Sequence, residues 1–258
     1  MDDYHKDTYL GVLPIVYDGE IHSMGIGKGR ILEYAVKMKR LPDEMLMKSV
    51  FLKGELKTGH LRKIARVLAR FHLSARNSVD IDKFGEPGMF RVNTDENFAQ
   101  TEKYIGRTIQ RKAFDALKKW TTDFYNSYGE LFWRRIKAKK IRDCHGDLHM
   151  EHICLTEDLP IFDCIEFNKK FRYTDTVCDI AFLVMDFEYH GGNAYSKILW
   201  DLYKEMAEQV YLNNKKRFQT VDLEDLKALY PSLDIIHLLV DTTSDLVDEW
   251  YVIGKMTR

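Results

Sequence analysis

Apolar residues recur along the chain with two different periods, one typical of strands and one typical of helices. Two short runs near the N-terminus, residues 9–17 and 31–38, are apolar and flank a polar stretch that contains several glycines. This pattern predicts a β-hairpin or a short meander. Residues 60–76 predict an amphipathic helix, because their apolar side chains fall three and four positions apart, at Leu61, Ile64, Leu68 and Phe71.

The rest of the chain favours helices over strands. Residues 77–93 contain two glycines and a proline, and we interpret them as a loop. Residues 95–140 have a mostly helical pattern, with a break expected near Gly129. Further helices are predicted at 177–188, 195–215, 222–229 and 232–253. A chain of 258 residues with this pattern forms one large domain or two unequal lobes, and it is long enough to bury a sizeable core.

Composition and charge narrow the class of function. The chain has 39 basic and 40 acidic residues, which argues against a nucleic-acid binder with its usual basic excess. No window approaches the length of a membrane span, and the polar, acidic N-terminus does not resemble a secretory signal. We therefore expect a cytoplasmic protein that contacts no membrane. Its four cysteines are then reduced thiols, although an even count leaves disulfides as the alternative.

Candidate chemistry is concentrated around one central hairpin. Two short apolar runs, 153–155 and 159–162, flank a polar turn. Asp147 precedes this hairpin and Asp163 ends it. Loops beside a hairpin can direct several side chains into one cleft. Two carboxylates there can divide the work of phosphoryl transfer, one orienting a hydroxyl as a base and the other holding a divalent cation.

Several motifs in this region are specific enough to compare with known families. They are His145-Gly146-Asp147-Leu148-His149, His152-Ile153 and Ile161-Phe162-Asp163-Cys164-Ile165-Glu166-Phe167, followed by Asp179-Ile180-Ala181-Phe182-Leu183-Val184-Met185-Asp186. Together they resemble the catalytic core of aminoglycoside phosphotransferase-like kinases, in the branch often fused to a P-loop ATPase domain. The resemblance covers roughly residues 9–210. It implies a protein-kinase-like α+β fold, with a curtailed β-rich N-lobe at 1–45 and a mostly helical C-lobe at 46–258.

The resemblance also implies a role for each matching residue. Asp147 matches the catalytic aspartate, and Asp163 matches the aspartate that chelates Mg²⁺ on the nucleotide phosphates. His152, five positions after Asp147, stands where the family usually has an asparagine ligand. Because imidazole is a poorer Mg²⁺ ligand than an amide oxygen, His152 either orients the loop or shifts the preference toward Mn²⁺. Glu166 is expected at a second metal or at the substrate, and Asp179 matches a carboxylate that braces the catalytic loop.

The nucleotide-binding part allows two interpretations of residues 25–37. The glycines of this stretch, followed by Lys37, resemble a kinase glycine loop and its phosphate-binding lysine. However, only seven residues separate Gly29 from Lys37, which is too few for the usual loop, strand and return. We therefore interpret 34–42 as the hinge-proximal strand, with Lys37 and Met38 as the cofactor-binding residues. On this interpretation the chain starts in mid-lobe, without the family's first strands, its lysine and its helix glutamate.

The resemblance implies an enzyme that transfers a phosphoryl group from ATP to a hydroxyl of a small molecule, with Mg²⁺ or Mn²⁺. The alternative is a degenerate pseudokinase or binding module that lacks the N-lobe lysine and has a regulatory or partner-dependent role. Its partner would be a separate P-loop ATPase domain or a chain that completes the N-lobe.

The histidines and cysteines of the central segment leave a zinc site as a weaker alternative. The donors would be His145, His149 and His152 with Cys144 and Cys154, but the spacing is loose and no glutamate occupies the zincin position. His72, in the predicted helix 60–76, needs no catalytic role.

Overall fold

The computed structural model describes residues 8–217, with side chains described through residue 209. The predicted helices at 222–229 and 232–253 lie outside the described residues. The described chain forms two compact units. The first contains residues 8–60 and 149–163, and the second contains residues 61–148 and 164–217. The division of the chain into lobes at residue 45 stays a prediction.

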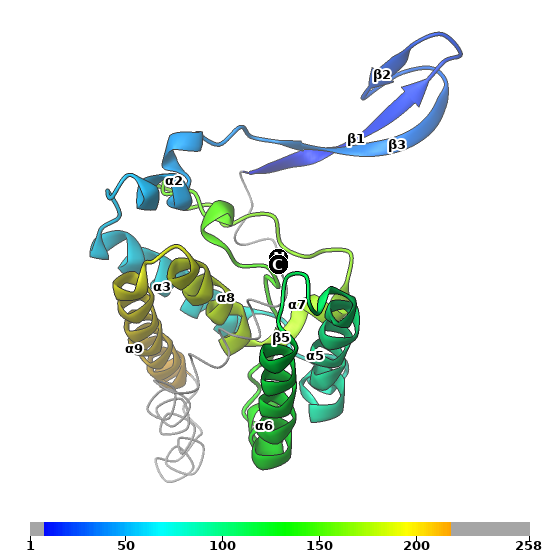
Figure 1. Ribbon diagram of the computed structural model, residues 1–258. Coiled ribbons are helices and arrows are strands. Elements are labelled where there is room, and N and C mark those ends of the chain that lie inside the picture. Colours follow the sequence, from blue (N-terminus) through cyan, green and yellow to red (C-terminus); the bar gives the residue numbers. More distant parts are fainter. Residues whose placement is uncertain (1–7, 218–258) are drawn as a thin grey trace. The chain divides into compact units, whose positions relative to one another are not determined.

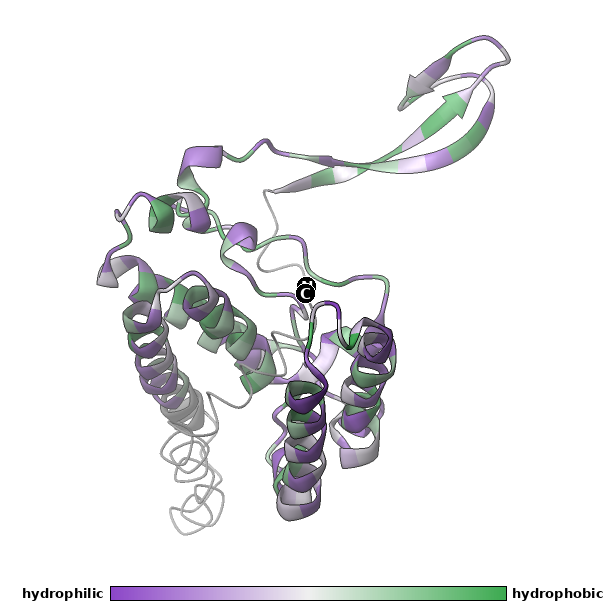
Figure 2. Cartoon of the chain, in the orientation of Figure 1, coloured by the Kyte–Doolittle hydropathy of each residue, from purple (hydrophilic) through white to green (hydrophobic). Residues whose placement is uncertain are grey.

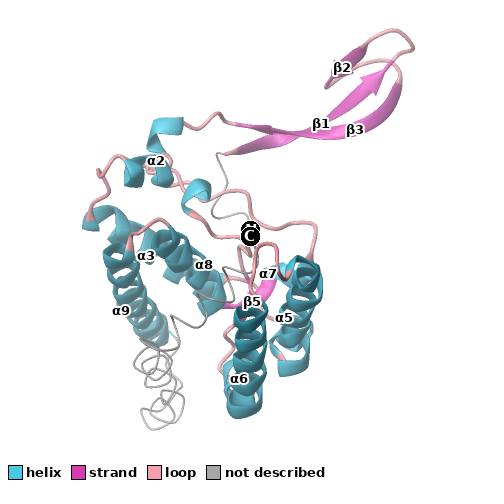
Figure 3. Ribbon diagram, viewed as in Figure 1, coloured by secondary structure: helices cyan, strands magenta, loops and turns pink. Residues whose placement is uncertain are grey.

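The N-terminal part of the first unit is an antiparallel sheet of three strands in the order β2-β1-β3 (Figures 1 and 3). The strands are β1 (Tyr9–Tyr17), β2 (His22–Met24) and β3 (Arg30–Met38). The predicted meander is therefore confirmed. Gly29 directly precedes β3 and has a φ of +137°. It lies so close to β1 that an added Cβ would be 2.3 Å from the Tyr17 carbonyl oxygen. Only glycine fits this position.

Apolar residues lie along both long strands of the sheet, as Figure 2 shows by colour. Few of them are buried: Val16 is 3% exposed, whereas Val12, Tyr34 and Val36 are 57–62% exposed. The sheet therefore buries little apolar surface of its own, and the main core of the first unit lies elsewhere.

That core forms where the segment after the sheet meets the predicted central hairpin. The segment contains η1 (Asp43–Met45) and α2 (Met47–Leu52), and the hairpin follows η4 (Met150–His152). The amide of Met47 donates to the Ile153 carbonyl at 2.8 Å, and the amide of Leu155 donates to the Met45 carbonyl at 2.8 Å. The hairpin itself is reduced to a bridge between Ile153 and Ile161 with flanking hydrogen bonds. Buried side chains of both segments pack there, among them Met47, Met150, Ile153 and Ile161.

The second unit is helical apart from one pair of short strands. Its elements are α3 (Thr58–Ser74, which begins in the first unit), α4 (Val79–Asp82), η2 (Lys83–Gly85), α5 (Pro87–Thr101), η3 (Glu102–Tyr104), α6 (Arg111–Lys137), β4 (Ile141–Asp143), α7 (Lys169–Arg172), β5 (Tyr173–Asp175), α8 (Thr176–Tyr189) and α9 (Asn193–Arg217). The predicted helices at 60–76, 177–188 and 195–215 correspond to α3, α8 and α9. None of the described helices is long and apolar enough to cross a membrane.

The prediction of a loop over 77–93 is wrong. The chain forms α4 and η2 there and then begins α5 at Pro87. The Ser78 side chain caps α4 by accepting a hydrogen bond from the Ile81 amide at 3.3 Å. Proline is favourable at the first position of a helix, where its missing N–H is not needed. The break expected near Gly129 is confirmed at its neighbour Tyr128, whose φ of −117° and ψ of 19° interrupt α6.

A buried ion pair fixes the start of α8, the helix that matters most for the candidate site. Arg135 on α6 donates to both carboxylate oxygens of Asp175, and the two side chains are 5% and 10% exposed. Asp175 also caps α8 by accepting from the Val177 amide at 2.9 Å. The first turn of α8, which carries Asp179, is therefore held from two sides.

Candidate active site

The loop after β4 carries Asp147 and is enclosed by the segment that leads into α7 and β5. The Cys144 amide donates to the Arg172 carbonyl at 2.9 Å, and the Ile165 amide donates to the His145 carbonyl at 2.9 Å. Gly146 has a φ of +84°, and a Cβ there would lie 3.0 Å from the Phe171 carbonyl oxygen. The loop therefore turns sharply in a space that only glycine fills without strain.

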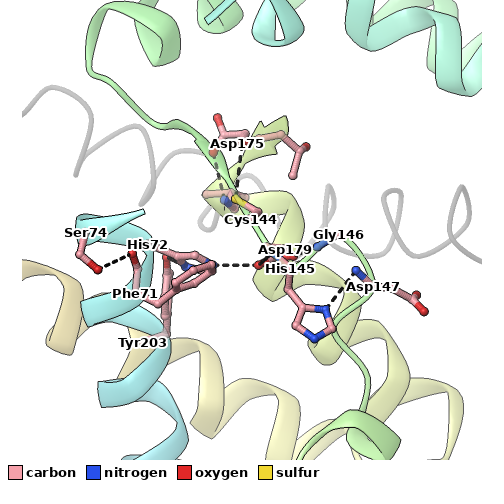
Figure 4. A network of polar contacts seen from close by, with 12 residues as sticks. Phe71, His72, Ser74, Cys144, His145, Gly146, Asp147, Asp175, Asp179 and Tyr203 are labelled. Atoms are coloured by element: carbon pink, nitrogen blue, oxygen red, sulfur yellow. Dashed lines mark hydrogen bonds and ion pairs between the residues drawn. The ribbon is translucent and has the colours of Figure 1, made fainter. Parts of the chain in front are cut away.

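The carboxylate of Asp179 holds this loop by accepting hydrogen bonds from two backbone amides of the loop. It accepts from the Gly146 amide at 2.8 Å through one carboxylate oxygen, and from the His145 amide at 3.0 Å through the other. The second oxygen also lies 3.0 Å from Nε2 of His72 (Figure 4). Asp179 is 0% exposed. This arrangement agrees with the brace that the resemblance implies.

The charge of Asp179 is retained despite its burial. Burial alone raises the pKa of a carboxyl group, because the charged form loses its hydration. Here the hydrogen bond from His72, the nearby imidazoles of His72 and His145, and the His145 amide outweigh burial, so the pKa of Asp179 is lowered. The carboxylate therefore stays an acceptor for all its donors.

Asp147 is positioned by this loop but is not part of the brace. Its amide donates to Nδ1 of His145 at 3.3 Å, and its side chain is half-buried. Figure 4 shows its carboxyl group directed away from His145 and Asp179. The loop thus fixes the backbone of Asp147 while its carboxyl group points out of the network.

Asp163 ends the central hairpin in the first unit, in a conformation unusual for an aspartate. Its φ is +61°, and its amide donates to the hydroxyl of Tyr9 at 2.9 Å. A carboxylate oxygen of Asp163 lies 3.4 Å from Nε2 of His152, and the side chains are 75% and 14% exposed. The structure thus brings together two of the three predicted metal ligands.

These two donors suit a divalent cation. An imidazole nitrogen and a carboxylate oxygen 3.4 Å apart are close enough to bind one ion, and the exposed carboxylate remains accessible to it. His152 follows Glu151, whose carboxylate pairs with Lys48 on α2, so the turn that carries His152 is tied to this helix. Glu166, the third predicted ligand, is exposed and belongs to the second unit, as does Asp147. The convergence of Asp147 and Glu166 with Asp163 stays a prediction.

Lys37 and Met38, the predicted cofactor-binding residues, lie at the end of β3. Lys37 is exposed opposite Gly11, and Met38 lies opposite Tyr9. Because the hydroxyl of Tyr9 accepts from the Asp163 amide, Tyr9 links the end of β3 to the candidate metal residue. Tyr9 could not be identified as a site residue from the sequence, because one tyrosine at the start of a strand carries no signal.

A second cluster of possible metal ligands consists of His72, Cys144 and Asp179, whose donor atoms lie within 4.8 Å of one another. Burial raises the pKa of the Cys144 thiol well above its ordinary value, so the thiol stays protonated. The oxygens of Asp179 already accept from two amides and from His72. These features favour a hydrogen-bonded network over a metal site, and the cluster contains only Cys144 of the donors considered for zinc.

Comparison with known proteins identifies the family. The model of the phosphotransferase enzyme family matches residues 10–212. The chain belongs to this family. The match spans both units and contains Asp147, Asp163 and Asp179, and the small strand-rich part with a helical remainder is consistent with the kinase-like fold of the family. The expected resemblance is therefore confirmed, whereas its association with a P-loop ATPase domain stays a prediction.

The curated relatives of this phosphotransferase-family chain are uncharacterized. Proteins from two strains of Mycobacterium tuberculosis and one strain of Mycobacterium bovis are each 34% identical to it over 160 residues. The aligned region is 62% of this chain and 32% of each relative, so the chain matches about a third of their length. No solved structure matches the chain.

Proposed function

We propose that this chain is an ATP-dependent phosphotransferase whose acceptor is a hydroxyl group of a small molecule. The observation that carries the proposal is the loop of Asp147, held by the buried carboxylate of Asp179 through two backbone amides. This is the kind of rigid support that a positioned base requires. The family match over residues 10–212 supports the same class of reaction.

In the proposed reaction, Asp147 orients the acceptor hydroxyl and takes its proton. The acceptor oxygen forms a bond to the γ-phosphorus as the bond between that phosphorus and the oxygen of the leaving ADP breaks. Asp163 and His152 would hold the divalent cation, and Glu166 would contact a second cation or the substrate. When bound, the cation neutralises charge on the phosphate oxygens, which is the main requirement of phosphoryl transfer.

Lys37 and Met38 are the proposed nucleotide-binding residues of this enzyme. Met38 lies across from Tyr9, which contacts the backbone of Asp163. If a nucleotide base binds at the end of β3, its proposed binding residue Met38 and the proposed cation ligand Asp163 belong to the same unit of the chain. This shared unit supports the assignment of Met38.

The test is an ATP-consumption screen over a panel of hydroxylated metabolites, followed by Asp147→Asn with the acceptor that is found. Loss of the positioned base should lower turnover by about 10²–10⁴-fold. The variant should stay folded, because the amides of His145 and Gly146 keep their hydrogen bonds to Asp179. Asp158→Asn, at the exposed turn of the central hairpin, is the matched control and should keep full activity. An unaltered rate in Asp147→Asn would remove this residue from the mechanism.

The choice of cation is tested at His152. We expect the ratio of activity with Mn²⁺ to activity with Mg²⁺ to be higher in the wild type than in the variant His152→Asn. The amide oxygen supplied by the variant is a harder donor, which favours Mg²⁺. Equal Mn²⁺-to-Mg²⁺ activity ratios in the two proteins would show that His152 binds no cation and only orients the loop.

A second candidate function, a partner-dependent binding module, is favoured by the exposed sheet. Val12, Tyr34 and Val36 are each more than half exposed on a three-stranded sheet. A chain that completes the sheet, or a separate P-loop ATPase domain, would cover such residues. Calorimetric titration with ATP and Mg²⁺ or Mn²⁺ discriminates between the two candidates. An enzyme that acts alone should bind the nucleotide, whereas a partner-dependent module should bind it only after co-purification with the partner.

A further inference from the structure

The network around Asp179 continues beyond the brace, into helices far away in the sequence. His72 on α3 lies between two partners: its Nε2 is 3.0 Å from Asp179, and its Nδ1 is 2.7 Å from the hydroxyl of Tyr203 on α9. Figure 4 shows His72 between the tyrosine and the carboxylate. His72 is 4% exposed and Tyr203 is 6% exposed. Neither residue is part of the family motifs that identified the site.

The protons in this network can be assigned from the chemistry of its groups. Asp179 is a carboxylate and can only accept, so Nε2 of His72 must carry a proton. Burial raises the pKa of Tyr203, so its phenol keeps its proton. With Tyr203 as the donor to Nδ1, Nε2 is the ring nitrogen that donates to Asp179.

The geometry at Asp179 shows what this imidazole contributes. The carboxylate oxygen that accepts from His72 is the one that accepts from the His145 amide. The other oxygen accepts from the Gly146 amide. The donor on His72 therefore fixes the rotation of the carboxyl group, and this rotation decides whether both amides are bound together.

We propose that His72 is a positioning residue for the catalytic loop, and that Tyr203 keeps its ring in the tautomer that donates to Asp179. This inference rests on the proposed function only for its effect on turnover. His72 acts through Asp179 and the amides of His145 and Gly146, and it touches neither substrate nor cation. A misplacement of the loop by about 1 Å can lower an enzymatic rate about 10²-fold.

Three substitutions of His72 separate the role of its donor from its packing. In His72→Gln, the amide nitrogen can take the place of Nε2, so the hydrogen bond to Asp179 is kept. In His72→Asn, the shorter side chain reaches only the place of Nδ1, so this bond is lost. His72→Leu removes both bonds and fills the same buried space with an apolar side chain. Tyr203→Phe removes only the hydroxyl.

The first readout is hydrogen exchange of the backbone amides, which requires no turnover. In His72→Leu and His72→Asn, exchange at His145 and Gly146 should be faster by about tenfold or more, because each amide loses a well-oriented charged acceptor. The amides of α6 are the internal control and should keep their wild-type exchange. In His72→Gln, exchange at both loop amides should be close to wild type. Wild-type protection in a folded His72→Leu protein would overturn the proposal.

The second readout is the kinetics of phosphoryl transfer with the acceptor found in the screen. We expect His72→Leu and His72→Asn to lower kcat by about 10- to 100-fold with little change in KM for ATP. We expect His72→Gln to retain most of kcat, and Tyr203→Phe to lose about 3- to 10-fold. A purely structural role would make Gln as harmful as Asn, which would also overturn the proposal.

The two readouts distinguish failure of this inference from failure of the proposed function. Faster exchange at His145 and Gly146 in a protein without phosphotransferase activity supports the role of His72 and contradicts the enzyme. Unchanged exchange in an active enzyme supports the enzyme and contradicts the role of His72. Should His72→Leu fail to fold, the comparison of His72→Gln with His72→Asn still tests the role: equal protection of the loop amides and equal kcat in both would contradict it.

Discussion

Asp147 and Asp163, the two carboxylates that the family motif pairs, are supported in opposite ways. The loop of Asp147 is held by the fully buried Asp179 and by a glycine turn with no spare space. The Asp163 side chain is 75% exposed, and its backbone is held mainly by one hydrogen bond to Tyr9. The proposed base is therefore much more strongly preorganised than the proposed cation ligand.

This difference has a chemical reason. A base must meet the acceptor hydroxyl within a few tenths of an ångström, and a buried network supplies that precision. A cation ligand must instead bind and release an ion together with its nucleotide in each cycle. An exposed carboxylate beside a largely buried imidazole would serve that exchange, because a bound ion would itself order the ligands.

The largest effect that separates the two regions is expected from Asp179→Ala. This change leaves His72 and two loop amides without their acceptor, and removal of one member of a buried charged network costs about 3–5 kcal/mol. The free energy of unfolding from urea titration measures it. Asp158→Ala, at an exposed position, should change this free energy by less than about 0.5 kcal/mol. A similar small change in Asp179→Ala would show that the network does not stabilise the fold.

A smaller effect is expected from Gly146→Ala. The positive φ and the 3.0 Å approach to the Phe171 carbonyl oxygen should cost about 1–3 kcal/mol of stability. Gly129→Ala is the matched control, because a Cβ at Gly129 meets nothing within 4 Å in α6. That change should raise stability by about 0.5–1 kcal/mol. Equal effects of the two substitutions in urea titrations would show that a side chain at position 146 does not strain the turn.

The pH dependence of stability should carry the signature of Asp179. Its pKa is lowered in the folded protein from an ordinary value of 3.8, so below that value the unfolded chain binds more protons than the folded chain. Stability is therefore present in full above this pH and is lost as the pH falls through the lower folded value. Urea titrations from pH 6 to the acid limb should show a shallower loss in Asp179→Asn than in the wild type. Identical acid limbs would assign the loss to other carboxylates.

Local patterns predicted the elements whose signal is continuous along the chain. The spacing of Leu61, Ile64 and Leu68 predicted α3, and the motif around Asp147 predicted the loop and its family. The 77–93 segment was misread because glycine and proline are typical of loops, whereas Pro87 begins a helix. The partnership of His72 with Tyr203 could not be predicted, because 131 positions separate the two residues and only packing of α3, α8 and α9 brings them together.

The smallest stability effect, and the one that tests the cation side of the comparison, is expected from Asp163→Gly. A φ of +61° is strained for a side chain and unstrained for glycine. The change should therefore leave the free energy of unfolding unchanged or raise it by about 1 kcal/mol at most, whereas Asp163→Ala should lower it by about 1 kcal/mol. Mn²⁺ should raise the thermal unfolding midpoint of the wild type through mass action and leave both variants unaffected. A Mn²⁺ shift that survives in Asp163→Gly would place the cation elsewhere, and it would leave the exposed conformation of Asp163 without a function.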